Sequence, residues 1–410
     1  MQTMRFKSSG LIIYLSLLAA ITPFSTDIYL ASMPTIAREF HSSSLLLQLT
    51  LSLFFLGFAL GQLFWGPLSD KIGRKPTAII GISVYFIASV LCAFSVNINQ
   101  LIIFRLLQAL GACAGVVVAM AMVKDIFTEH NRMTKTLSFI ITILTLTPLI
   151  APIIGSYLLI HFNWPSNFYF LAGYGLFLIF AMCFIQESHP YQTRKPLPIN
   201  KLARTYLEQI QHKPFLLITI AVSANFCTMF AFISSSPFIY IDIYHVSTAQ
   251  FGYLFALNAL ALIIGSFILN HLKKRLADQA IMTIGTLGAL ITALIMSVLL
   301  TVNPTNIINM IIPSFMITFF VGMLMPLLMS LALKNVIHYA GLASALVGAL
   351  RFSAAALISA FIGVLIANNP APLPYTMSIL CLITLFFSQC YCKCYYSNAK
   401  ILKTNHNMAN

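Results

Sequence analysis

The stretch Gly66–Pro76, which reads GPLSDKIGRKP, lies between two apolar segments and has the composition of a tight loop. Gly66 is small enough to let neighbouring membrane helices approach closely. Asp70 is short enough to accept backbone N–H bonds at a helix N-terminus, where the helix dipole favours an anion. Gly73 supplies a tight turn, and the basic residues, including Arg74, keep the loop on the inner side of a membrane. The alternative interpretation is an arbitrary charged loop.

The composition of the 410-residue chain excludes an ordinary soluble protein. Only 8% of the residues are charged, 59% are hydrophobic and the mean hydropathy is +0.91, whereas a soluble domain is about 25% charged. Such hydrophobicity also excludes disorder. A membrane-spanning helix needs about 20 apolar residues, and twelve apolar runs of that kind leave no room for a soluble catalytic or nucleotide-binding domain. These spans are expected near 11–30, 45–65, 77–96, 101–123, 136–160, 166–186, 215–240, 249–270, 280–302, 307–333, 342–366 and 374–391.

The charge pattern predicts the orientation of the chain. The net charge is +14, and with a cytoplasmic N-terminus Arg38 is the one basic residue placed in an outer loop. This positive-inside bias predicts that both termini are cytoplasmic. Because membrane topology accounts for the positive net charge, we do not expect the protein to bind nucleic acid. We expect the first span to be retained rather than cleaved as a signal peptide. The predicted protein is a multi-pass membrane protein.

A polar, proline-containing stretch divides the chain into six spans and six spans. The predicted organisation is a first six-helix bundle at 1–186, a cytoplasmic central loop at 187–213, a second six-helix bundle at 214–391 and a cytoplasmic tail at 392–410. The string Asp-Ile-Tyr recurs at the ends of spans one and seven, which favours an internal duplication. A short amphipathic helix is expected around 201–211.

The loop at 66–76 resembles the signature loop of the major facilitator superfamily. Three further stretches resemble motifs of that family: RLLQALG at 105–111, APIIG at 151–155, and STDIYL at 25–30. The chain departs from the usual glycines at Ala109, Ala151 and Ser156. Together with the stretches at 235–241, 250–252 and 341–348, the pattern is similar to the bicyclomycin-resistance (Bcr/CflA) subfamily. The resemblance covers nearly the whole chain up to about residue 391.

This resemblance implies an all-α fold of twelve transmembrane helices in two six-helix bundles around a central cavity. It also implies alternating access by a monomer in a bacterial inner membrane, with export of small molecules against proton entry. The kink expected at Pro148 and Pro152, where proline removes helix hydrogen bonds, and the close packing expected at Gly155 would belong to the antiporter motif of that family.

Ionisable residues within spans are costly and mark functional sites. Asp27 and Arg105 both lie in the outer part of the membrane, at depths that allow a direct or cavity-mediated interaction. Desolvation and nearby cations shift a carboxyl pKa in opposite directions, so an Asp whose surroundings alternate can take up and release a proton. We predict Asp27 as the proton-coupling group, with Arg105 tuning it. The alternatives are a helix-end Asp that never titrates and an Arg that only binds neighbouring carbonyls.

Two further charged residues are substrate-cavity candidates. Asp242 lies near the outer boundary, where a solvated loop residue is an equal alternative. Arg351 lies about nine residues into span eleven, roughly 13 Å deep at 1.5 Å per residue. By resemblance, related exporters carry an uncharged residue there, commonly Gln. This departure from the pattern suggests an anionic or zwitterionic substrate, with a purely structural role as the alternative.

Polar and aromatic residues within the spans complete the predicted cavity, although helical aromatic stripes also serve plain packing. These candidates are Tyr29, Gln62, Gln108, Asn225, Phe226, Phe230 and Asn258. The sequence contains no Walker loop and no metal-ligand spacing, so neither ATP, a metal nor another cofactor is expected.

The predicted function is proton-coupled efflux of small molecules, of the multidrug type. A dedicated exporter of one metabolite, dipeptide or siderophore is the main alternative. A channel is disfavoured by the duplicated layout, and an intramembrane enzyme by the lack of paired catalytic residues on adjacent helices. We therefore expect a transporter and not an enzyme.

Overall fold

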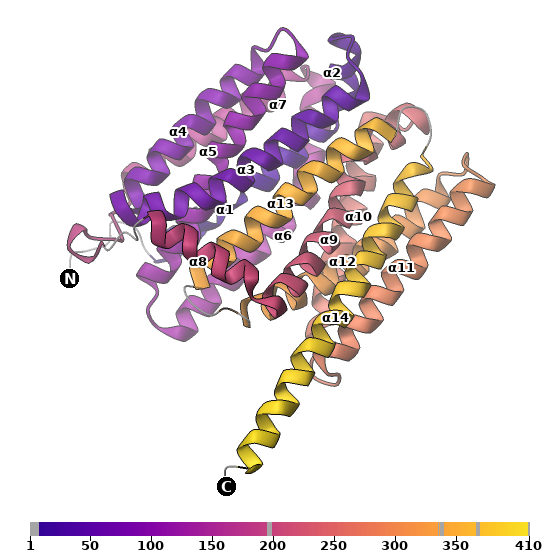
Figure 1. Ribbon diagram of the computed structural model, residues 1–410. Helices are drawn as coiled ribbons and strands as arrows, with labels where there is room; N and C mark the ends of the chain where they lie inside the picture. The colour runs from indigo at the N-terminus through magenta and orange to yellow at the C-terminus, as the bar shows by residue number, and fades with distance from the viewer. Residues whose placement is uncertain (1–7, 195–198, 335, 337–339, 366–369, 409–410) are drawn as a thin grey trace. The chain divides into compact units, whose positions relative to one another are not determined.

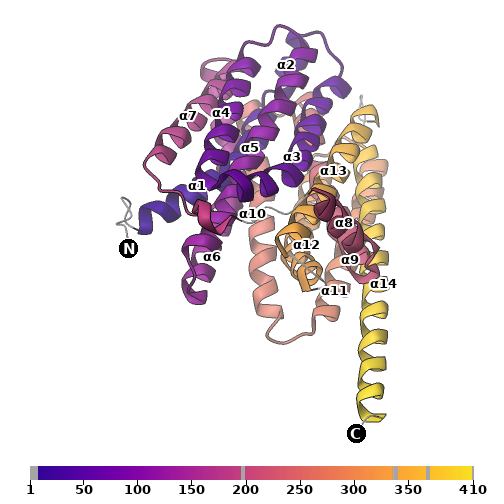
Figure 2. The ribbon, with the colours of Figure 1, turned by 60° about the vertical axis from the view of Figure 1, so that its left-hand side comes forward.

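A computed structural model describes residues 8–194, 199–334, 336, 340–365 and 370–408. In this part of the chain the secondary structure is helical, and Figures 1 and 2 show long, neighbouring helices. The elements are α1 (Ser8–Leu30), α2 (Met33–Glu39), α3 (Ser44–Ile72), α4 (Arg74–Ala93), α5 (Ile98–Ile126), α6 (His130–His161), α7 (Pro165–Cys183), η1 (Tyr191–Thr193), α8 (Ile199–Gln211), α9 (Lys213–Pro237), η2 (Phe238–Ile243), α10 (Thr248–Leu272), α11 (Asp278–Val302), α12 (Ile308–Lys334), α13 (Ala340–Leu365) and α14 (Pro372–Met408).

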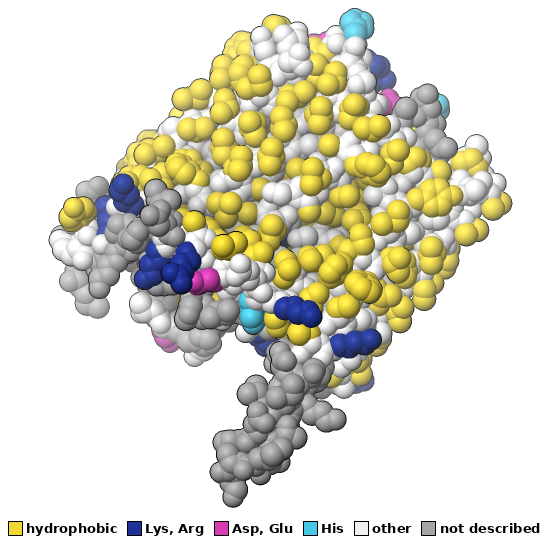
Figure 3. Space-filling model, viewed as in Figure 1, with side chains coloured by type: hydrophobic (Ala, Val, Ile, Leu, Met, Phe, Trp, Pro, Cys, Tyr) yellow, Lys and Arg dark blue, Asp and Glu magenta, His cyan; other side chains and the backbone are white. Residues whose placement is uncertain are grey.

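Twelve of the described helical segments are long and apolar enough to cross a membrane, which confirms the predicted number of spans. Several helices extend beyond the predicted apolar runs. Helix α3 continues to Ile72, inside the predicted loop, and α14 continues to Met408. Figure 3 shows one face, where apolar side chains cover the flanks of the helices and Lys and Arg gather near α8 and at helix ends. Such an apolar exterior suits contact with lipid.

The chain forms two compact units. Unit 1 comprises residues 1–198, 233–260 and 355–370, and unit 2 comprises residues 199–232, 261–354 and 371–410. Each unit has its own buried core. The core of unit 1 includes the fully buried Phe54, Phe55 and Phe168, and that of unit 2 includes Phe215 and Leu327.

Small residues permit the closest helix contacts in each unit. In unit 1, Gly155 of α6 lies directly against the backbone carbonyl of Ile28 in α1, where an added Cβ would clash. In unit 2, Gly265 of α10 lies against the Phe319 carbonyl of α12 in the same way. Close backbone approach at small residues increases van der Waals contact between helices in a membrane.

The short helix α8 is amphipathic, as predicted for the stretch around 201–211. Its Tyr206 and Ile210 pack against the core of unit 2, whereas Arg204 and Glu208 form an exposed pair at 2.7 Å. One face of α8 is therefore held by apolar packing and the other is polar.

Candidate functional site

The guanidinium of Arg105 is completely buried in unit 1, with 0% exposure. Its Nη1 donates to the carbonyl of Ser25 at 2.9 Å and to Oε1 of Gln108 at 2.6 Å. The amide of Gln108 then donates to the hydroxyl of Ser89 at 2.7 Å. A chain of hydrogen bonds thus joins α1, α5 and α4 through one arginine.

Three aromatic rings surround the same guanidinium. The Arg105 Cζ lies 4.3 Å from the ring centroid of Phe54, 4.7 Å from that of Tyr29 and 5.9 Å from that of Phe168. Cation–π attraction of this kind strengthens when water is excluded. Among the described residues, Arg105 has no carboxylate partner, and its Nε and Nη2 have no hydrogen-bond partner. The site therefore holds a buried cation that rings and carbonyls alone stabilise.

Asp27 lies near the end of α1 and is 3% exposed. Its Oδ1 accepts a hydrogen bond from the Thr26 hydroxyl at 2.8 Å, and no ion pair joins it to Arg105 in the described chain. The two predicted coupling residues are instead connected through the backbone, because Arg105 binds the carbonyl of Ser25, two residues before Asp27. The contact between them is thus indirect.

The signature loop is a charge network centred on Arg74, the first residue of α4. Its Nη1 lies 2.6 Å from Oδ1 of Asp70 and 2.7 Å from the Ser69 hydroxyl, and its Nε lies 2.8 Å from Oδ2 of Asp125. Gly73 has a φ of 104°, a left-handed conformation that favours glycine. The tight turn predicted at Gly73 is therefore present, and Asp125 of α5 is a member of the network that the motif did not reveal.

Two predictions about this loop are wrong. Asp70 does not cap a helix N-terminus, because α3 continues past it and its carboxylate pairs with Arg74. Gly66 permits no close helix contact among the described residues of unit 1, since a Cβ added there would meet none of their atoms within 4 Å.

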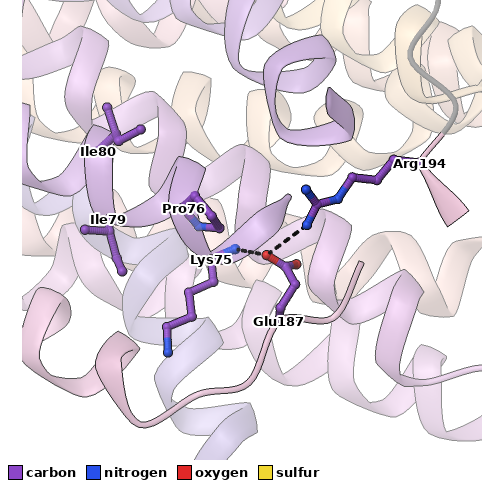
Figure 4. Close-up of a pocket in the computed structure, with 6 residues that line it drawn as sticks. All are labelled: Lys75, Pro76, Ile79, Ile80, Glu187 and Arg194. Carbon is purple, nitrogen blue, oxygen red and sulfur yellow. Dashed lines mark hydrogen bonds and ion pairs between the residues drawn. The ribbon is translucent and has the colours of Figure 1, made fainter. Parts of the chain in front are cut away.

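The acceptor at the N-terminus of α4 is Glu187, which follows α7. Its Oε1 accepts from the backbone N–H of Arg74 at 2.9 Å, and its Oε2 accepts from that of Lys75 at 3.1 Å. Arg194 lies 3.8 Å from the same carboxylate. Figure 4 shows Glu187 between Lys75 and Arg194, beside a pocket that is also lined by Pro76, Ile79 and Ile80. The loop after α7 therefore fastens the start of α4.

Three further predicted residues of the motif lie on α6, and Asp242 lies on η2. Pro148 and Pro152 are both inside the continuous helix α6, which also carries Gly155. Asp242 lies in the π-helical segment η2, where its half-exposed carboxylate is 3.9 Å from the exposed Arg38.

The predicted cavity residues fall into separate groups. Tyr29 and Gln108 lie beside Arg105 in unit 1, whereas Phe226, Phe230 and Arg351 lie together in unit 2. Asn225, also in unit 2, donates to the Val321 carbonyl at 3.3 Å. In unit 1, the buried Asn258 donates to the Leu254 carbonyl at 3.3 Å. Gln62 is half-buried, and none of the described contacts joins it to Arg105 or to Arg351.

Comparison with known proteins identifies the family. The family model described as Major Facilitator Superfamily matches residues 15–360. An uncharacterized MFS-type transporter, YdgK of Bacillus subtilis, is 33% identical, over 85% of this chain and 87% of its own length. A bicyclomycin resistance protein homolog of Haemophilus influenzae is 31% identical, over 91% of this chain and 94% of its own length.

Two other matches agree with this assignment. The multidrug resistance protein MdtL of Shewanella oneidensis is 28% identical, over 85% of this chain and 87% of its own. The crystal structure of a D-xylose-proton symporter has the same fold, with a TM-score of 0.76 at 14% identity, over 93% of this chain and 97% of its own. With its twelve apolar helices and the network of its signature loop, this chain belongs to the Major Facilitator Superfamily and is a multi-pass membrane transporter.

Proposed function

We propose that this protein exports small molecules by proton antiport, as a multidrug-type transporter that works by alternating access. The names of two relatives, a bicyclomycin resistance protein homolog and a multidrug resistance protein, support export as the direction of transport and drugs as the substrates. The organisms of these relatives support a bacterial inner membrane, and the distribution of Lys and Arg supports cytoplasmic termini.

The observation that carries the proposal is the burial of Asp27 and Arg105 in one unit, linked through the end of α1. A carboxyl group that is buried in one conformation and open to water in another differs in proton affinity between the two conformations. Asp27 is therefore the group that takes up and releases the proton.

Arg105 transmits the protonation state of Asp27 to the neighbouring helices. It holds the carbonyl of Ser25 on α1 and, through Gln108, the hydroxyl of Ser89 on α4. A shift of α1 along α5 would break the bond to Ser25 and leave a buried cation short of acceptors, which costs free energy. In our proposal, proton binding at Asp27 changes the position of α1, and Arg105 couples that position to the rest of unit 1.

The network at the signature loop makes the inner ends of α3, α4 and α5 move together. Arg74 joins Asp70 of α3 to Asp125 of α5, and Glu187 holds the first N–H groups of α4. Rigid movement of one half against the other is the motion that alternating access requires. We place Gly73, Arg74 and the contact of Gly155 with α1 in this supporting role.

The experiment measures proton movement with a pH dye in proteoliposomes of the wild type, Asp27→Asn and Arg105→Ala. Addition of an exported compound should drive proton flux in the wild type, and both variants should lose it. Asp278→Asn and Arg38→Ala are the matched controls, because both side chains lie in partly exposed ion pairs. Full proton-coupled transport by Asp27→Asn would contradict the proposal, as would substrate movement that ignores a collapsed proton gradient.

A dedicated exporter of one metabolite, dipeptide or siderophore is the second candidate, because unit 2 contains the unpaired cation Arg351. Proton flux with one acidic compound, and none with a panel of drugs, would favour it. Substrate flux that saturates as the substrate concentration rises would support a carrier. A conductance that does not saturate would support a channel.

The organisation of the chain is also proposed. We place the two bundles at 1–186 and 214–391, with the loop 187–213 between them and the segment 392–410 in the cytoplasm of a monomer. Reporter fusions at the two termini test the orientation, and cross-linking of the purified protein tests the monomer.

A further inference from the structure

Arg351 lies on α13 and is held by aromatic rings of unit 2. Its Cζ is 4.8 Å from the ring centroid of Phe226 and 5.0 Å from that of Phe352. These two rings contact each other edge to face at 4.9 Å, and Phe230 contacts Phe226 at 4.5 Å. All three phenylalanines are buried, while Arg351 keeps partial exposure. The rings therefore flank a guanidinium that is only partly enclosed.

The Arg351 guanidinium has no acceptor in the described part of the chain. It forms no ion pair, and its buried Nε has no hydrogen-bond partner. Its two aromatic contacts are cation–π contacts, which supply no oxygen acceptor for the N–H donors of the group.

Unit 2 has no carboxylate left to supply that acceptor. Its only acidic residues in the sequence are Glu208 and Asp278. Glu208 pairs with Arg204 at 2.7 Å, and Asp278 pairs with Lys334 at 3.9 Å. A cation within a membrane span is costly without a partner. Arg105 donates to two carbonyl oxygens, whereas the buried Nε of Arg351 has no acceptor among the described residues. Arg351 therefore points to an anion from outside the unit.

We propose that Arg351 is a substrate-binding residue that recognises the carboxylate of an organic anion or zwitterion. The planar guanidinium offers parallel N–H donors that match the two oxygens of a carboxylate. Phe226 and Phe352 are positioning residues, since both rings lie within about 5 Å of the guanidinium carbon and hold the cation in place without supplying an oxygen acceptor. This inference rests on the proposed transport function and names the substrate class of its site.

Equilibrium binding to the purified full-length protein tests the inference. The probes are 2-naphthoate, its neutral isostere 2-naphthamide, and 2-naphthylmethylammonium. Wild type should prefer 2-naphthoate. Arg351→Gln should lower the affinity for 2-naphthoate by about 10- to 100-fold, the range for loss of a charge-assisted hydrogen bond. Its affinity for 2-naphthamide should change less than about threefold, because a neutral amide gains little from the cation.

Two further variants keep the result interpretable. Arg351→Lys retains the positive charge but lacks the planar guanidinium with its parallel N–H donors, so it should bind 2-naphthoate with intermediate affinity. If Arg351→Gln does not fold, Arg351→Lys should still fold and allow the measurement. Arg275→Gln removes an exposed arginine of the same unit and should bind all three probes as wild type does. Equal affinity of wild type and Arg351→Gln for 2-naphthoate would overturn the inference, as would a wild-type preference for the ammonium probe.

The same probes separate this inference from the proposed function. Arg351-dependent binding of 2-naphthoate, with no proton flux for any compound in proteoliposomes, would keep the anion site and refute proton antiport. Proton flux driven by the ammonium probe alone, unchanged in Arg351→Gln, would keep antiport and refute the anion site.

Discussion

The contact between Gly155 and α1 allows a direct test of how tightly unit 1 is packed. In Gly155→Ala, the new methyl group would overlap the carbonyl of Ile28, which belongs to the backbone and cannot turn aside. The helices α1 and α6 must then separate. Overpacking of this kind costs about 1–3 kcal/mol, which corresponds to a change of about 5- to 150-fold in the unfolding equilibrium.

Gly173→Ala is the matched control, because Gly173 is also helical and a Cβ there meets nothing within 4 Å. Alanine is favoured over glycine within a helix by about 0.5–1 kcal/mol, so this variant should be as stable as the wild type or more stable. The difference between the two variants isolates the steric cost from helix propensity.

Unfolding of the purified protein by sodium dodecyl sulfate in mixed micelles, followed by tryptophan fluorescence, measures the effect. Both tryptophans of the sequence, Trp65 and Trp164, are buried in unit 1, so the signal reports on the unit that is altered. Equal unfolding free energies for Gly155→Ala and Gly173→Ala would refute the close contact of α6 with α1.

Four other substitutions have different expected effects on the same unfolding free energy. Glu187→Gln weakens the acceptor for the first N–H groups of α4 and should cost about 1 kcal/mol, whereas Glu208→Gln, in an exposed pair, should cost under about 0.5 kcal/mol. Gln108→Leu breaks the chain from Arg105 to Ser89 and should cost about 1.5–3 kcal/mol; a cost below about 0.5 kcal/mol would refute that chain. Arg38→Gln removes an exposed pair at 3.9 Å, so its cost should stay below about 1 kcal/mol and fall further with added salt.

The spans could be predicted from the sequence because each crossing of a membrane requires a long apolar run, which leaves a local signal. The same holds for Gly73, where the turn needs a residue that tolerates positive φ. The amphipathic helix α8 was likewise visible in its local pattern.

Partners in the candidate site could not be predicted, because they come from distant positions. Glu187 caps a helix that begins 113 residues earlier, and nothing local assigns that role to it rather than to Asp70. The contact of Arg105 with Ser25 is made to a backbone carbonyl, which every residue possesses.

The attachment of Glu187 to α4 also defines where the gene could be divided. A first fragment that ends after α7, at Cys183, would lack the carboxylate that satisfies the N–H groups of Arg74 and Lys75. A fragment that ends after Arg194 would keep that carboxylate together with its basic neighbour. For co-expression of two separate polypeptides, the short segment beyond the last transmembrane helix of the first half is therefore part of that half, and not a dispensable connector.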